Sequence, residues 1–190
     1  MRVFIAVLVL IFSLQSWTKA DDIRDIQIEG ISIGDSALDY FSEEKILNNR
    51  VHYFKDKKFT PVEISYAPFF EVYWLVSFAY KSEDKKYIIE RLSGSIDFSN
   101  NIKNCKKEKN KIMKEISGSV KSIKFKNYPE EAHAADPSGK SRVWWSDFRF
   151  NNGDMIIVQC TDYAEETGWA DHLSVELRTN DFNKFLKTAY

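Results

Sequence analysis

The sequence has few prolines and glycines, which interrupt regular structure, and few cysteines, which can cross-link a fold. Its 190 residues include only four prolines, seven glycines and two cysteines, and no low-complexity segment. So few prolines and glycines leave little room for disordered linkers. The two cysteines, Cys105 and Cys160, are too few for a disulfide-rich scaffold and too far apart for a Cys-x-x-Cys redox motif. After the N-terminal segment, no apolar run is long enough to span a membrane.

An excess of one charge is also lacking. Residues 1–20 contain Arg2 and Lys19 and no acidic residue, so residues 21–190 carry 25 basic and 28 acidic residues, a net charge of −3. This balance gives no argument for a nucleic-acid partner, and we predict none. The three histidines have no metal-ligand spacing, so neither a metal nor another cofactor is predicted.

The N-terminus has the pattern of an export signal. Arg2 precedes an apolar run that ends at Leu14, and small residues stand at positions −3 and −1 of a cut before Asp21. We therefore predict a signal peptide at 1–20 and a periplasmic or secreted protein over 21–190. An uncleaved N-terminal anchor is the alternative.

The cysteine pair fits that compartment. In an oxidising environment, Cys105 and Cys160 are most simply a disulfide, although two buried free thiols remain possible. Cys105 lies on the apolar stripe of a predicted helix over 100–116, and Cys160 shares a strand face with Val158. Both therefore point into one helix–sheet interface.

Apolar periodicity predicts an α+β fold. Alternation with period two indicates antiparallel strands, and Asn152-Gly153 is a favoured hairpin turn. We expect one or two antiparallel sheets with helices packed on one face, as a single domain over 21–190 with possible subdomains 21–93 and 94–190. Helices are predicted near 36–47, 100–116 and 181–187, and strands near 51–54, 62–67, 70–81, 86–91, 119–126, 142–150, 155–162 and 171–178.

A weak internal repeat is also present. Gly30 is followed at +8 and +11 by apolar helix residues, and Gly94 is followed at the same offsets by Ile102 and Cys105. Each predicted helix then precedes several strands. The pattern predicts a tandem α-β-β-β-β unit with a terminal helix.

The best candidates for a binding surface are two adjacent tryptophans. Trp144 and Trp145 point to opposite sides of a predicted strand, so one belongs to the core and the other is available for binding. His133 and Asp136 lie before them in a long polar loop. A small hydrolase or carbohydrate-active site built on the 128–145 loop is the alternative function.

No catalytic residue is predicted. The alternating residues His172, Ser174 and Glu176 lie on one strand face, where same-face neighbours are ~6.7 Å apart, too far for a nucleophile–base hydrogen bond. The predicted helix over 100–116 carries a lysine-rich face, which is either a solvated surface or a contact for an anionic membrane or an acidic partner. The lysines placed on that face are Lys103, Lys106, Lys107, Lys109, Lys111 and Lys114.

One motif carries a family resemblance. The stretch Gly30-Ile31-Ser32-Ile33-Gly34-Asp35-Ser36 before an amphipathic helix resembles uncharacterised small exported proteins of marine alphaproteobacteria. It is also distantly similar to the beta-lactamase-inhibitor-protein-like fold, which includes small outer-membrane lipoproteins of barrel assembly. The chain departs from that pattern because it has no lipid-attachment cysteine. The resemblance implies a non-enzymatic interaction module, whose partner would be another protein or an envelope component.

Overall fold

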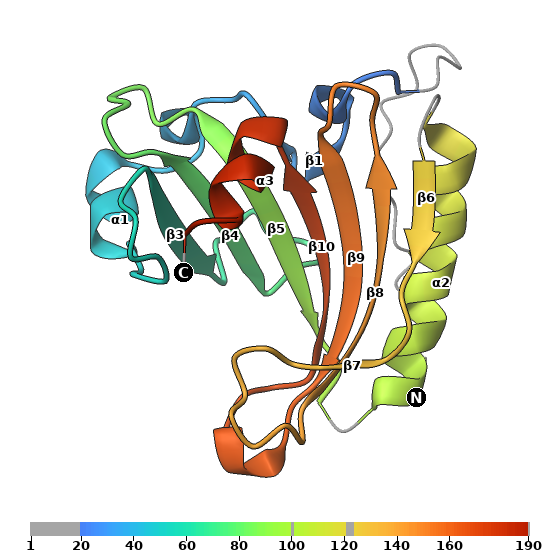
Figure 1. Ribbon diagram of the computed structural model, residues 1–190. Coiled ribbons are helices and arrows are strands. Elements are labelled where there is room, and N and C mark those ends of the chain that lie inside the picture. The colour runs from blue at the N-terminus through green and yellow to red at the C-terminus, as the bar shows by residue number, and fades with distance from the viewer. Residues whose placement is uncertain (1–19, 100, 121–123, 190) are drawn as a thin grey trace, which may run out of the picture.

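A computed structural model describes residues 20–99, 101–120 and 124–189, and it shows an α+β fold (Figure 1). The predicted signal peptide lies outside these residues except for Ala20, which is buried and donates its backbone N–H to Ser119. No helix within the described ranges is long and apolar enough to cross a bilayer.

The main sheet has eight antiparallel strands in the order β3-β4-β5-β10-β9-β8-β6, and β7 pairs with β8. Its strands are β3 (Phe59–Ser65), β4 (Leu75–Lys81), β5 (Ile89–Asp97), β6 (Lys124–Asn127), β7 (Glu131–Ala132), β8 (Arg142–Arg149), β9 (Met155–Asp162) and β10 (His172–Arg178). A separate pair consists of β1 (Gln27–Ile28) and β2 (Ile31–Ser32).

The sheet joins the two halves of the chain. The strands β3-β4-β5 and β8-β9-β10 each form a meander, and the two meanders meet where β5 pairs with β10. A helix precedes each half of the sheet, but the predicted four strands after each helix are not found: β3, β4 and β5 follow α1, and β6 to β10 follow α2. The predicted strand over 51–54 is absent. Within that segment, the backbone N–H of Val51 donates to the carbonyl of Pro61 in β3, at the edge of the sheet. Because β5 crosses the predicted boundary between residues 93 and 94, both halves share one sheet.

The helices are α1 (Glu43–Asn48), α2 (Ile102–Ser119) and α3 (Asn180–Leu186), with 3₁₀ turns η1 (Ile23–Asp25), η2 (Ala37–Asp39) and η3 (Glu165–Thr167). The helix predicted over 36–47 is two pieces, η2 and α1. The break follows from two serine caps, because the Ser36 side chain accepts the N–H of Leu38 and the Ser42 side chain accepts that of Lys45.

The long helix α2 packs against β9 and β10 and runs beside β6 in Figure 1. Cys105, on its buried stripe, forms the predicted disulfide with Cys160 of β9, with 6.0 Å between their Cα atoms. We call this side of the sheet the helical face. Its buried side chains include Leu92, Ile156, Val158, Leu173 and Val175.

The predicted class, helices packed on an antiparallel sheet, is confirmed. The short α3 is the exception to a single helical face. Its Phe182 and Phe185 rings lie 5.1 Å and 4.9 Å from the ring of Phe59, on the side of the sheet opposite to the main core. Figure 1 shows α3 in front of β4 and β5.

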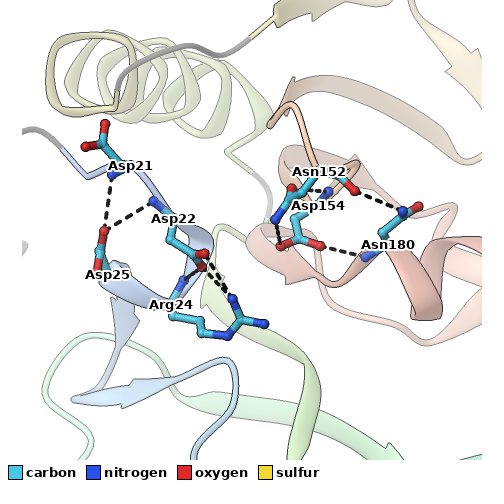
Figure 2. Close-up of polar contacts among 7 residues, drawn as sticks. All are labelled: Asp21, Asp22, Arg24, Asp25, Asn152, Asp154 and Asn180. Carbon is cyan, nitrogen blue, oxygen red and sulfur yellow. Dashed lines mark hydrogen bonds and ion pairs between the residues drawn. The ribbon is translucent and has the colours of Figure 1, made fainter.

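Side-chain and backbone hydrogen bonds fix the start of α3 (Figure 2). Asp154, in the β8–β9 turn, accepts the backbone N–H of Asn180 at 2.7 Å, and the Asn180 amide donates to the carbonyl of Asn152 at 2.9 Å. Thr179 caps the helix by accepting the N–H of Phe182. The predicted hairpin turn thus has a second role, since it positions the C-terminal helix.

One lysine of α2 lies elsewhere than predicted. Lys109 is buried, 5% exposed, because it shares the stripe of Cys105 and Ile112. Its Nζ donates to Ser146 Oγ at 2.7 Å, and that hydroxyl in turn donates to Asn127 of β6 at 2.6 Å. Lys109 therefore ties the edge strand to the helix and takes no part in a solvated lysine face. Burial lowers its pKa.

Close packing around Gly94 leaves no room for a side chain. A Cβ there would lie 2.5 Å from Tyr73 Cδ1 and 2.8 Å from Ile28 Cγ2. We predict that Gly94→Ala lowers the free energy of unfolding by about 1–3 kcal/mol through overpacking. The measurement is urea unfolding followed by circular dichroism. Gly118→Ala is the control, because among the described residues no atom beyond its chain neighbours and its own helix backbone lies within 4 Å of its Cβ position; an equal loss in both variants would contradict the packing argument.

Candidate binding face

Outside the part where α3 packs on Phe59 and Ala79, the second side of the sheet carries most of the polar side chains, and we call it the polar face. Cross-strand partners point to the same side, so strand register defines its rows. One row consists of Ser95, Ser174, Gln159 and Trp145, on β5, β10, β9 and β8. Serines dominate the centre of this face, and Ser77 pairs with Ser93 in the neighbouring row. A sheet that used this side for core packing would carry apolar residues at these positions.

A charged network lies at the centre of the polar face. Glu176 of β10 accepts hydrogen bonds from the guanidinium groups of Arg91 and Arg178, the latter through Nε at 2.7 Å and Nη2 at 3.0 Å. Arg91 Nη1 also donates to Ser77 Oγ at 2.6 Å. Burial alone would raise the pKa of Glu176, but the charges of Arg178 and Arg91 outweigh it and lower that pKa to about 2.

A tyrosine stands beside this network. The hydroxyl of Tyr53 donates to Glu63 Oε1 at 2.5 Å, and 53% of Tyr53 is exposed. Burial of the hydroxyl and its bond to Glu63 raise the pKa of Tyr53, while the nearby charge of Arg91 lowers it. The phenol is therefore a neutral hydrogen-bonding group at ordinary pH.

An aromatic stack borders the face at β8. The rings of Trp145 and Tyr128 lie 3.6 Å apart and nearly parallel, at 8°. Tyr128 donates its hydroxyl to Asp147 Oδ2 at 3.0 Å, and Arg149 donates to the same oxygen. Asp147 is fully buried, and its Oδ1 has no hydrogen-bond partner among the described residues. That oxygen can accept a further donor.

A second aromatic group lies at the end of the face where β9 ends and β10 begins. Tyr163 is its centre: its ring lies 5.0 Å from His133, 5.0 Å from Trp169 and 5.7 Å from His172. Burial lowers the pKa of both histidines, and the charge of His172 lowers that of His133 further. Both imidazoles are neutral near pH 7 and can donate or accept hydrogen bonds.

The four candidate binding residues predicted from the sequence, Trp144, Trp145, His133 and Asp136, lie in different surroundings. Trp144 faces α2, with Lys106 Nζ 3.3 Å from its ring centroid, whereas Trp145 lies on the polar face. His133 joins the aromatic group around Tyr163. Asp136 is buried, and its carboxylate accepts from backbone and hydroxyl groups of the loop.

The contacts of Asp136 give it a structural role. Both Ser138 and Ser141 donate to it through their N–H and hydroxyl groups at 2.7–2.9 Å. These bonds, with those of Ser141 the stronger, lower the pKa of the carboxyl. The 128–145 loop is therefore closed around Asp136 by its own hydrogen bonds.

Sequence reasoning missed the charged network and the residues Tyr53, Tyr163 and Trp169. Strand alternation contained part of the signal, because it places Arg91, Ser93 and Ser95 on one side of β5. The pairing of β5 with β10, which brings Arg91 beside Glu176 across 85 residues, has no local signal.

The polar face can bind through hydrogen bonds, ion pairs and stacking. Within the described part of the chain, no group of three or more histidine, cysteine or acidic residues could hold a metal ion. Comparison with protein-family models, curated proteins and solved structures found no match.

Proposed function

We propose that this protein is an exported, non-enzymatic binding protein that holds another protein or an envelope component on its polar face. The observation that carries the proposal is the row Ser95–Ser174–Gln159–Trp145, which adjoins the Arg91–Glu176–Arg178 network on the side away from α2. Small polar groups beside fixed charges and an aromatic stack supply both hydrogen bonds and apolar contact, the combination used in protein interfaces.

The disulfide supports the export part of the proposal. Cys105 and Cys160 are fully buried and bonded to each other, and such bonds persist in oxidising compartments such as the periplasm. The resemblance to small exported interaction modules points in the same direction. The predicted signal peptide at 1–20 completes the argument.

The hydrolase alternative is a weaker proposal. It requires His133 and Asp136 to act together, but the Asp136 carboxylate accepts four hydrogen bonds from two loop serines. The loop contributes more to recognition, because His133 lies against the exposed aromatic group.

A bulky substitution in the middle of the polar face tests the proposal. We predict that Ser174→Trp weakens saturable binding of the labelled protein to isolated envelopes of its source cells at least ~10-fold, which corresponds to about 1.4 kcal/mol. Ser174 is only partly buried and lies in the middle of the row between Ser95 and Gln159, so a ring at this position would stand over the polar face. Binding is measured by co-sedimentation.

Lys107→Trp is the matched control, because Lys107 is exposed on α2, the helix that packs on the other side of the sheet. It should bind as the parent protein does. Equal binding by parent and Ser174→Trp proteins would refute the polar face as the binding surface. Circular dichroism confirms that each variant is folded.

A further inference from the structure

We propose that the end of the polar face beside Trp169 is a subsite for a neutral saccharide. The inference rests on the proposed function, because the aromatic group that holds Trp169 is part of that face. It names the chemical class of one ligand that the binding protein recognises.

A cavity of about 330 Å³ lies beside the indole of Trp169. This volume is at the lower end of the range for small-molecule sites. Its walls come from two separate loops: Asp136, Pro137 and Ser138 on one side, and Glu166, Thr167 and Trp169 on the other. Two carboxylates, two hydroxyls and one large aromatic ring therefore line an open pocket that suits a single sugar ring.

The indole is presented as a fixed platform. Trp169 is 52% exposed, yet its ring meets Tyr163 edge-on at 5.0 Å and His133 at 6.4 Å. Its backbone N–H donates to Thr167 Oγ1 at 3.2 Å, and Gly168 before it has a left-handed φ of 67°. A ring that is ordered before binding loses little conformational entropy on binding, which favours affinity.

The mixture of groups favours a sugar over an apolar ligand. The C–H groups of a pyranose pack on an aromatic face, and its hydroxyls need donors and acceptors around the rim. Glu166, Thr167 and Ser138 provide acceptor oxygens at the walls, because the hydroxyls of Ser138 and Thr167 already donate to Asp136 and to the carbonyl of Ala164. The neutral His133 lies behind the platform. Ala135 and Pro137 are the cavity's small apolar groups, too few to bury a large hydrophobic molecule.

Charge selects a neutral saccharide. In the described segments 128–142 and 163–171, the lysine and arginine residues are Lys140, paired with Glu166, and Arg142, paired with Glu130. Acidic residues outnumber them in the two loops, where the sequence places Glu130, Glu131, Asp136, Glu165 and Glu166. A polysaccharide that carries carboxylate or phosphate groups would be repelled.

The experiment is a titration of the ¹⁵N-labelled protein with chitotetraose and with cellotetraose, followed by NMR. We expect saturable shifts of the Trp169 indole N–H signal and of the His133 backbone amide with at least one of these sugars. In Trp169→Ala the affinity should fall about 10-fold or more, as for loss of an aromatic anchor. Tyr66→Asn is the control, because Tyr66 is an aromatic residue 77% exposed outside the site, with a φ of 51° that asparagine tolerates.

Three results would overturn the inference. The first is no saturable shift with either sugar, and the second is equal sugar affinity in the parent protein and Trp169→Ala. The third is that choline shifts the same signals while neither sugar does, which would indicate a site for organic cations. The result is separable from that for Ser174→Trp. Loss of envelope binding in Ser174→Trp with no sugar response would leave the binding face supported and the saccharide subsite refuted. A Trp169-dependent sugar response with normal envelope binding by Ser174→Trp would leave the saccharide subsite supported and the centre of the polar face refuted as the envelope-binding surface.

Discussion

Reduction of the Cys105–Cys160 disulfide is expected to lower the free energy of unfolding by about 4 kcal/mol. The bond joins residues separated by 55 positions in sequence, and the chain-entropy model assigns a stabilisation of that size to a loop of this length. For a chain of this size the melting temperature should fall by roughly 10 °C. Urea and thermal unfolding of the protein with and without reductant measure the effect.

The double variant Cys105→Ala/Cys160→Ala separates the cross-link from other effects of the reductant. Both sulfur atoms are buried between α2 and β9, so the double variant should lose the same stability as the reduced protein, plus a smaller amount for the lost volume. A reduced protein that unfolds at the same urea concentration as the oxidised one would show that the bond contributes nothing to stability.

The parts of the fold that sequence reasoning predicted are those with a strong local pattern. The β8–β9 hairpin followed from alternation and the Asn152-Gly153 turn, and α3 followed from its capping residue. The disulfide followed from compartment and from the faces of two elements. In each case the decisive residues lie within a few positions of one another, or belong to periodic segments.

Lys109 is a residue whose burial was predicted wrongly, although the sequence pattern contained the signal for it. It lies four residues after Cys105 and three before Ile112, the spacing of one helix face, so its position on the stripe followed from periodicity. Residue type alone, in contrast, predicts a solvent-exposed lysine at this position. The Ser146 hydroxyl that makes its burial tolerable is on β8, 37 residues away, and has no local signal.

The candidate face was less predictable because it depends on long-range pairing. Trp145 was named from the sequence, but the stack that orders it requires Tyr128, which reaches it only because the chain before β8 runs back along that strand. In the aromatic group around Tyr163, His133 of the 128–141 loop contacts residues of the segment between β9 and β10. Register between distant strands is set by the whole sheet, so no window of the sequence contains these contacts.

Glu176→Gln is expected to lower the free energy of unfolding at pH 7 by about 3–5 kcal/mol, because it leaves two guanidinium groups close together without their carboxylate. Glu176 is 8% exposed, and it accepts from both Arg91 and Arg178. The depressed pKa, about 2 in place of 4.5, corresponds to about 3 kcal/mol of stabilisation of the charged form. Urea unfolding of both proteins at pH 7 measures the loss.

The pH dependence separates this charge effect from lost packing. Because the folded-state pKa lies below the unfolded value, the contribution of Glu176 is fully present above about pH 4.5 and is lost as the pH falls toward 2. The stability difference between the parent protein and Glu176→Gln should therefore shrink over that interval. Glu108→Gln, which breaks the surface pair with Lys111, should cost less than ~0.5 kcal/mol at every pH. A difference between parent and Glu176→Gln that stays constant from pH 7 to 2.5 would mean that the side chain acts through shape, and that the charges of Arg91 and Arg178 are neutralised by other groups.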